Sequence, residues 1–123
     1  MGREKRLCGS SGEAIASDFL KKKGYRIIAK NLRTPFGEID IVTRHAGLTV
    51  FVEVKTRTTS SLGPPYISIT GKKIRHIIKN SAFYMRRHNL SDSQWRVDIV
   101  SVKLNRDYKP EKIELIENAI EEN

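Results

Sequence analysis

Hydrophobic residues near the start of this chain of 123 residues recur at the spacing of a helix. Ser10, followed three residues later by Glu13, is the pattern of a capping box, which starts helices. Gly24 favours a stop at the other end. We therefore predict a first helix over residues 11–23. Its apolar side consists of Ile15, Ala16, Phe19 and Leu20.

Five later segments are rich in β-branched and aromatic residues, which is typical of strands. Pro35 and Gly37 separate the first two segments, and Ala46 with Gly47 separates the second from the third. Turn residues between two alternating segments favour a hairpin, which we predict over residues 38–57. The last segment also fits a short helix. The predicted strands are residues 25–32, 38–44, 48–57, 95–104 and 112–117.

A second helix is predicted over residues 71–88, after a polar, turn-rich segment at 58–66. Thr70 is a suitable N-cap, and hydrophobic side chains gather on one side of this helix. The element order αβββαββ predicts an α/β fold with a mixed central sheet flanked by helices. A single domain accounts for residues 1–123, with residues 1–9 flexible. The apolar side of the second helix consists of Ile74, Ile77, Ile78, Ala82, Phe83 and Met85.

The composition predicts a soluble protein rather than a membrane or secreted one. Hydrophobic residues make up 38% of the chain, and no apolar run approaches the roughly 20 residues that span a bilayer. No signal-peptide pattern follows the basic start, so we expect a cytoplasmic protein. Cys8 is the single cysteine, which excludes an intrachain disulfide, and the three histidines lack metal-ligand spacing.

The net charge of +9, with a pI near 9.9, predicts a polyanionic partner such as a nucleic acid. The basic excess lies in residues 1–34 and 72–109, whereas residues 35–71 are neutral. Carboxylates in that centre would weaken simple phosphate binding, so we expect chemistry there. The candidate nucleic-acid contacts are Arg57, Lys72, Lys73, Arg75 and Lys79, with Arg86 and Arg87 beyond them.

Two carboxylates meet if the predicted hairpin pairs Arg44 with Thr49. In that register Asp40 lies opposite Glu53, with β-carbons about 4.5–5.5 Å apart, and the like charges destabilise the pair unless a cation intervenes. Mg²⁺ commonly takes one or two carboxylates, waters and phosphate oxygens. Lys55 shares the strand face of Glu53, where it can stabilise a phosphate during hydrolysis. The pattern therefore indicates a phosphodiester hydrolysis site.

Each of these features also has a plainer interpretation. The two acids and Lys55 fit the solvated face of a half-buried hairpin, and a shift of one residue would separate the acids. Glu13 fits a purely capping role. The basic residues of the second helix fit solvated positions, and three aromatic residues fit core packing better than stacking on bases. These aromatic residues are Tyr25, Tyr84 and Trp95.

Asp40 with the downstream Glu53-Val54-Lys55 resembles the D…(D/E)xK signature of the restriction-endonuclease-like, or PD-(D/E)XK, nuclease superfamily. Ile39 stands where the superfamily's name motif has proline. More specifically, four segments within roughly residues 10–120 resemble the YraN-like family of uncharacterised bacterial proteins. That family looks related to archaeal-type Holliday junction resolvases. The segments are GEAIASDFLKKKGYRIIAKN, GEIDIV, FVEVKTR and WRVDIVSV.

The resemblance implies a restriction-endonuclease-like fold with a site for Mg²⁺ or Mn²⁺. It implies that Asp40 and Glu53 bind the metal, that Lys55 assists the attacking water, and that Glu13 completes the acidic site. Glu38 is a motif position whose role the resemblance leaves open. Resolvases of this fold act as symmetric dimers, so a homodimer is implied as well.

Three functions are compatible with the sequence. The leading hypothesis is a Mg²⁺- or Mn²⁺-dependent endonuclease that hydrolyses phosphodiester bonds in DNA, with branched or structured DNA as one candidate substrate. The main alternative is a non-catalytic nucleic-acid-binding module on a nuclease-like fold, for which the basic helices suffice. The third is an adaptor that binds a protein through the acidic segment at residues 111–123.

Overall fold

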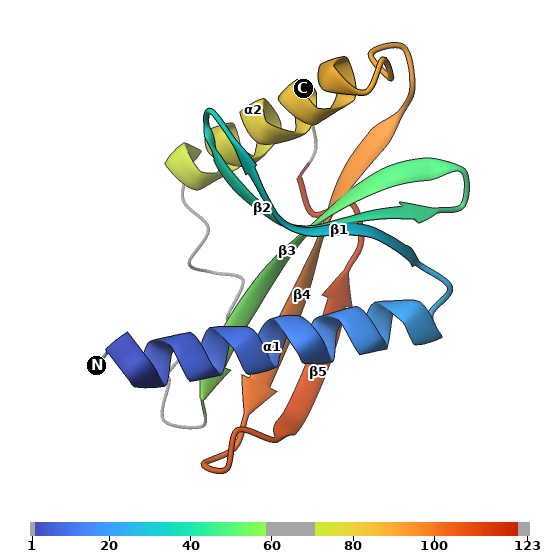
Figure 1. Cartoon of the computed structure of the whole chain (residues 1–123). Helices are drawn as coiled ribbons and strands as arrows, with labels where there is room; N and C mark the ends of the chain where they lie inside the picture. Colours follow the sequence, from blue (N-terminus) through green and yellow to red (C-terminus); the bar gives the residue numbers. More distant parts are fainter. Residues whose placement is uncertain (1, 59–70, 121–123) are drawn as a thin grey trace.

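Two helices and five strands form the described part of the chain, in the order αβββαββ predicted from the sequence (Figure 1). The computed structural model describes residues 2–58 and 71–120, with side chains from residue 11 onward. The α/β fold class is confirmed. The elements are α1 (Gly2–Lys22), β1 (Arg26–Thr34), β2 (Gly37–His45), β3 (Leu48–Thr58), α2 (Gly71–Arg87), β4 (Trp95–Leu104) and β5 (Pro110–Ile116).

The strands form one mixed sheet in the spatial order β1-β2-β3-β4-β5. Three of its strand pairs are antiparallel: β1 with β2, β2 with β3, and β4 with β5. β3 and β4 are parallel, because the chain crosses over between them through α2. The predicted hairpin register is confirmed, since Arg44 pairs with Thr49 and Ile41 with Val52.

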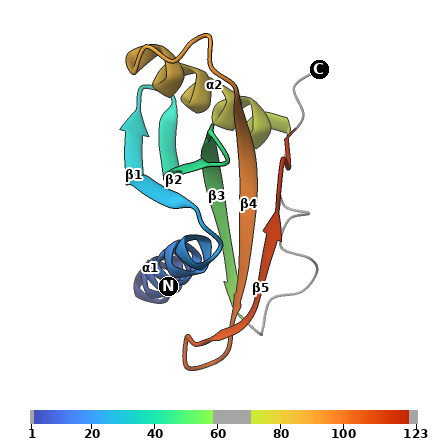
Figure 2. The ribbon, with the colours of Figure 1, turned by 90° about the vertical axis from the view of Figure 1, so that its right-hand side faces the viewer.

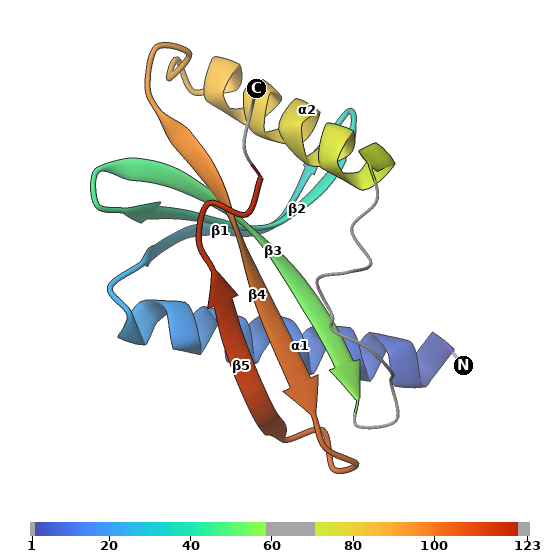
Figure 3. The same ribbon diagram turned by 180° about the vertical axis from the view of Figure 1, so that it is seen from behind.

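The helices cover opposite faces of this twisted sheet, α1 over β3 and β4, and α2 over β2 and β1 (Figures 2 and 3). Under α1, Ala16 and Leu20 pack on a buried cluster of strand residues. Under α2, the hydrophobic cluster includes Val42 and Phe51, which by alternation share their strand faces with Asp40 and Glu53. The interpretation of these acids as a solvated face is therefore wrong for Glu53, which is buried, because both faces of the sheet are apolar and covered.

The start of α1 also differs from the prediction. The helix begins at Gly2, so Ser10 and Glu13 lie inside it and form no capping box at its start. Residues 2–10 contain no proline and include arginine, lysine, glutamate and leucine, which favour helix. That residues 1–9 are flexible stays a prediction.

Other predicted elements agree with the structure. Pro110–Ile116 is a strand paired with β4, which decides against a short helix there. Tyr25 and Tyr84 are buried, and the Trp95 ring packs edge-on against Phe51, so core packing is confirmed for these aromatic residues. Most of the turn-rich segment at 58–66, and the predicted cap Thr70, lie outside the described residues. No helix in the described ranges is long and apolar enough to cross a membrane.

Candidate functional site

The β2 and β3 strands separate inside the sheet, and the candidate acids lie at the point of separation. Ile41 and Val52 form the last pair of the β2–β3 ladder. Beyond that pair β2 continues along β1, while β3 continues along β4 (Figure 1). We call this point the fork. Asp40 and Glu53 are the first residues of the two strands beyond it.

The separation explains why simple alternation fails at one position. Ile39 packs in the cluster under α2 together with Val42, although the two residues differ in parity along β2. Simple alternation would place Ile39 on the same face as Ile41, which packs under α1, but the structure places Ile39 under α2. Once β2 leaves β3, it keeps β1 as its partner, and this lets the strand twist towards α2.

At the fork, the carboxylate of Asp40 accepts a hydrogen bond from the β3 backbone that a paired strand would otherwise accept. Its Oδ2 accepts a hydrogen bond from the backbone N–H of Val54 at 2.8 Å. No hydrogen bond to Oδ1 occurs in the described ranges. Glu53 is only 8% exposed and its negative charge acts on the partly buried Asp40, so the two carboxylates lie close together in a site largely shielded from water.

This environment changes the protonation of Asp40. Burial, reinforced by the negative charge of Glu53, raises the pKa of Asp40 to about 7. Glu13 raises the pKa further, so its charge acts on the fork from α1, whereas the Val54 N–H and Lys73 lower it. Near neutral pH the Asp40 carboxyl is therefore about half protonated, and a bound cation would displace that proton.

Lys73 of α2 forms an ion pair with one member of this acid pair. Its Nζ lies 3.0 Å from Oε1 of Glu53, while the lysine side chain stays 43% exposed. Burial lowers the pKa of Lys73, but the hydrogen bond and charge of Glu53 outweigh this effect and raise it. The sequence predicted Lys73 as a phosphate contact, whereas the structure places its amine on a candidate catalytic carboxylate.

Lys55 and Glu13 complete the set of candidate catalytic residues. Lys55 is half-buried on β3, two residues beyond Glu53 and therefore on the same strand face. Glu13 is half-buried on α1. The preceding Gly12 touches β3 so closely that a Cβ there would overlap the Thr56 side chain. This contact is the reason α1 can bring Glu13 near the fork.

The donor set fits a hard divalent cation with a small protein contribution. In residues 11–58 and 71–120, no three carboxylate, histidine or cysteine side chains form a group that could hold a metal. That Glu13 joins Asp40 and Glu53 as a third ligand, as the resemblance implies, stays a prediction. Two carboxylates suit Mg²⁺, which keeps several waters and takes phosphate oxygens from its substrate.

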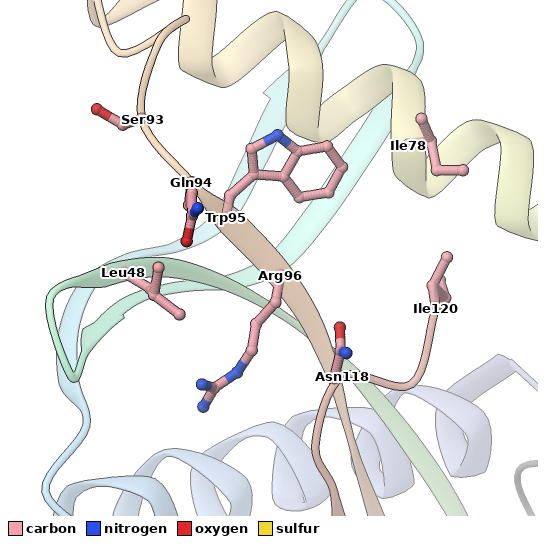
Figure 4. Close-up of a pocket in the computed structure, with 8 residues that line it drawn as sticks. All are labelled: Leu48, Ile78, Ser93, Gln94, Trp95, Arg96, Asn118 and Ile120. Carbon is pink, nitrogen blue, oxygen red and sulfur yellow. The ribbon is translucent and has the colours of Figure 1, made fainter. Parts of the chain in front are cut away.

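The space beside the acids is small, and a larger cavity lies elsewhere in the described structure. A cavity of about 10 Å³, which is room for about one water, lies between Glu53, Glu38 and Asn80. A cavity of about 560 Å³ lies at the edge of β4 (Figure 4). Trp95 and Arg96 point to opposite sides of the strand there, so one small ligand would not contact both.

The predicted nucleic-acid contacts are spread over two elements. Lys72, Arg75 and Lys79 are exposed on α2, and Lys79 lies over the Phe36 ring. Arg57 is half-buried on β3. No acidic residue occurs in α2, so its solvent face presents a continuous positive charge that starts at the fork.

The sequence analysis did not single out Asp98 of β4, which is a buried carboxylate away from the fork. It is fully buried and accepts hydrogen bonds from the Tyr25 hydroxyl at 2.7 Å, Arg96 Nε at 2.9 Å and the Asn118 N–H at 2.9 Å. Arg96 also contacts His45, whose ring stacks on Tyr25. The signal was present in the sequence as a charged pair, Arg96 and Asp98, inside an otherwise apolar strand.

Comparison with known proteins identifies the family. Residues 12–102 match the uncharacterised protein family UPF0102. The chain belongs to this family. A UPF0102 protein of Pelobacter propionicus is 45% identical over 120 residues, covering 96% of this chain and 85% of that protein. UPF0102 proteins of Caldicellulosiruptor saccharolyticus and Desulfosudis oleivorans are 40% and 41% identical, covering 94% and 100% of this chain and 98% and 97% of theirs.

Membership in UPF0102 confirms the resemblance to the YraN-like family. The matching part of the chain contains the four candidate catalytic residues and the basic helix α2. The residues that form the fork therefore lie within the segment that matches UPF0102. The four residues are Glu13, Asp40, Glu53 and Lys55.

Proposed function

We propose that this protein is an endonuclease that uses Mg²⁺ or Mn²⁺ to hydrolyse phosphodiester bonds in DNA. The observation that carries the proposal is the fork, where Asp40 and Glu53 lie close together in a largely buried site and Lys55 follows on the same strand face. Like charges brought together away from water destabilise a fold, so their presence favours a function that needs them.

Each residue at the fork has a separate role in the proposed hydrolysis. Asp40 and Glu53 hold the ion, which supplies Lewis acidity and charge neutralisation when bound. Lys55 donates a hydrogen bond to the attacking water or to a phosphate oxygen, and so stabilises the extra negative charge as the water attacks phosphorus and the sugar oxygen leaves. Glu13 adds negative charge at the edge of the site. The exposed cations of α2 hold the DNA backbone.

The test is cleavage of labelled single-stranded, duplex, flap and four-way-junction DNA in Mg²⁺, Mn²⁺ or chelator. We expect the wild type to cut at least one substrate with either ion, and Asp40→Asn and Lys55→Ala to lose at least about 100-fold in rate while still binding DNA. Asp92→Asn, an exposed residue outside the fork, is the matched control. Wild-type levels of cutting by Lys55→Ala would show that the site is assigned wrongly.

A non-catalytic nucleic-acid-binding module is the second candidate. The observation that favours it is the ion pair of Lys73 with Glu53, which neutralises a buried carboxylate without a metal. Such a module would bind DNA equally in chelator and in Mg²⁺, would lose affinity steeply with salt, and would cut none of the four substrates.

A further inference from the structure

One ridge of α2 links the fork to a second polar cavity. Residues 73, 76, 80, 83 and 87 follow each other at spacings of three and four, which places them on one side of the helix. Lys73 contacts Glu53 at one end of the ridge, Asn80 is bonded by Thr34 in the middle, and Phe83 meets Phe36 edge-on.

The far end of the ridge borders a cavity of about 400 Å³, which we call the arginine cavity. It lies between the β1–β2 turn and the last turn of α2, and no carboxylate occurs among its described lining residues. Within residues 11–58 and 71–120, neither Arg33 nor Arg87 forms an ion pair. Its chemically distinctive lining residues are Arg33, Arg87, His88, Phe83, Tyr84 and Pro35.

Two arginines that converge without a counter-charge favour an anion between them. Arg87 gains from its place near the C-terminus of α2, and Arg33 lies opposite Glu38 in the β1–β2 ladder but forms no ion pair with it in the described part of the chain. Guanidinium groups bind phosphate through paired hydrogen bonds. The half-buried Phe83 ring and the exposed His88 ring beside them provide surfaces against which a nucleobase can stack, whereas Tyr84 is buried. Phosphate and base together are the chemistry of a nucleotide.

A base inside a duplex is already stacked on both sides and cannot enter such a cavity. We propose that the arginine cavity binds an unpaired nucleotide of a DNA strand whose neighbouring phosphates follow α2 towards the fork. Along the helix the cavity lies about 21 Å from Lys73, which is the length of several nucleotides. The direction of the strand rests on the proposed function, whereas binding in the cavity does not. The preferred substrate class is then DNA in which a duplex adjoins a single-stranded segment.

The test is equilibrium binding in chelator, where no cutting occurs. The probes are a short oligothymidylate, a blunt duplex, and the same duplex with a single-stranded tail. The variant is Arg33→Gln with Arg87→Gln. The control is Arg106→Gln with Lys109→Gln, which removes the same charge from exposed positions in the β4–β5 turn, at the opposite end of the molecule from α2 (Figure 1).

We expect the cavity variant to bind oligothymidylate and the tailed duplex about 10-fold or more weakly, and the control to lose about 3-fold or less. The salt dependence of oligothymidylate binding should fall by about 0.7 for each phosphate contact removed. Phe83→Leu keeps the charge and should weaken oligothymidylate more than the blunt duplex. Thermal melting of each variant establishes that it folds, and Arg33→Gln alone replaces the double variant if that one melts early.

The proposal is overturned if the wild type does not bind oligothymidylate or if the cavity variant binds it as tightly as the control does. An equal loss on the blunt and tailed duplexes also overturns it, because the arginines would then serve as a general phosphate surface. These results are independent of cleavage. Binding can fail while the nuclease test succeeds, or the reverse, so the two proposals fail separately.

Discussion

The sheet carries two buried aspartates, Asp98 and Asp40, whose surroundings differ sharply. Asp98 is paired with Arg96 and receives two further hydrogen bonds, from the Tyr25 hydroxyl and the Asn118 N–H. Asp40 receives one hydrogen bond, from the Val54 N–H, and faces the negative charge of Glu53. The negative charge of Asp98 is thus balanced by its partners inside the fold, whereas a negative charge on Asp40 is unfavourable beside Glu53.

The difference separates a structural carboxylate from a functional candidate. A buried charge that is fully paired joins elements, and here Asp98 ties β4 to the start of β1 and to the residues after β5. A buried charge held beside a like charge contributes nothing to folding, so it calls for another explanation. At the fork, the cation and the phosphate substrate of the proposed function would provide that explanation.

The largest effect should come from breaking the satisfied site. Asp98→Ala leaves the Arg96 guanidinium and the Tyr25 hydroxyl without their acceptor, so we expect a loss of about 3–5 kcal/mol in the free energy of unfolding. Chemical denaturation measures this loss. Asp92→Ala, in the exposed loop after α2, should change the stability by less than about 0.5 kcal/mol. Equal stabilities for the two variants would remove the contrast between the sites.

An intermediate effect of opposite sign is expected at the fork. The pKa of Asp40 is raised to about 7 in the folded chain, above its value near 4 in the unfolded chain. Between these values the folded state holds a proton that the unfolded state has released, so the folded state loses stability as pH rises from about 4 to 7.

Asp40→Asn removes this cost, so at pH 8 without divalent ions it should stabilise the protein by about 1–3 kcal/mol. Near pH 4 the variant and the wild type should unfold at similar denaturant concentrations. Mg²⁺ should raise the melting temperature of the wild type at pH 8 and have little effect on the variant. A destabilised variant at pH 8 would mean that the Val54 hydrogen bond outweighs the repulsion.

The smallest effect concerns Lys73, which partly restores balance at the fork. Lys73→Met removes the ammonium group from Glu53, and because the lysine is 43% exposed we expect a loss of only about 0.5–1 kcal/mol at pH 8. The variant should also gain more thermal stability from Mg²⁺ than the wild type does, since the ion then has no competitor. Lys72→Met, on the neighbouring exposed residue, is the control.

The local parts of this arrangement could be predicted from the sequence. Turn residues and alternation define the hairpin and its register, and the register brings Asp40 and Glu53 to the end of the ladder, one residue beyond the Ile41–Val52 pair. The remaining contacts depend on tertiary packing between distant segments. Lys73 reaches Glu53 only because α2 crosses the sheet, and Asp98 meets Tyr25 across 73 residues of chain. The close approach of Gly12 to Thr56 depends on how α1 lies on β3, which no periodicity encodes.

The single parallel strand pair determines the order in which the chain can assemble. The β2–β3 hairpin closes locally, whereas the β3–β4 ladder, which pairs Thr49 with Trp95, requires a long crossover and should be slow to form. The hairpin therefore brings Asp40 and Glu53 together before α2 delivers Lys73. During refolding the two charges repel each other without relief, so the hairpin should form faster in mild acid than at alkaline pH. The charge arrangement at the fork would thus slow an early step of folding at alkaline pH.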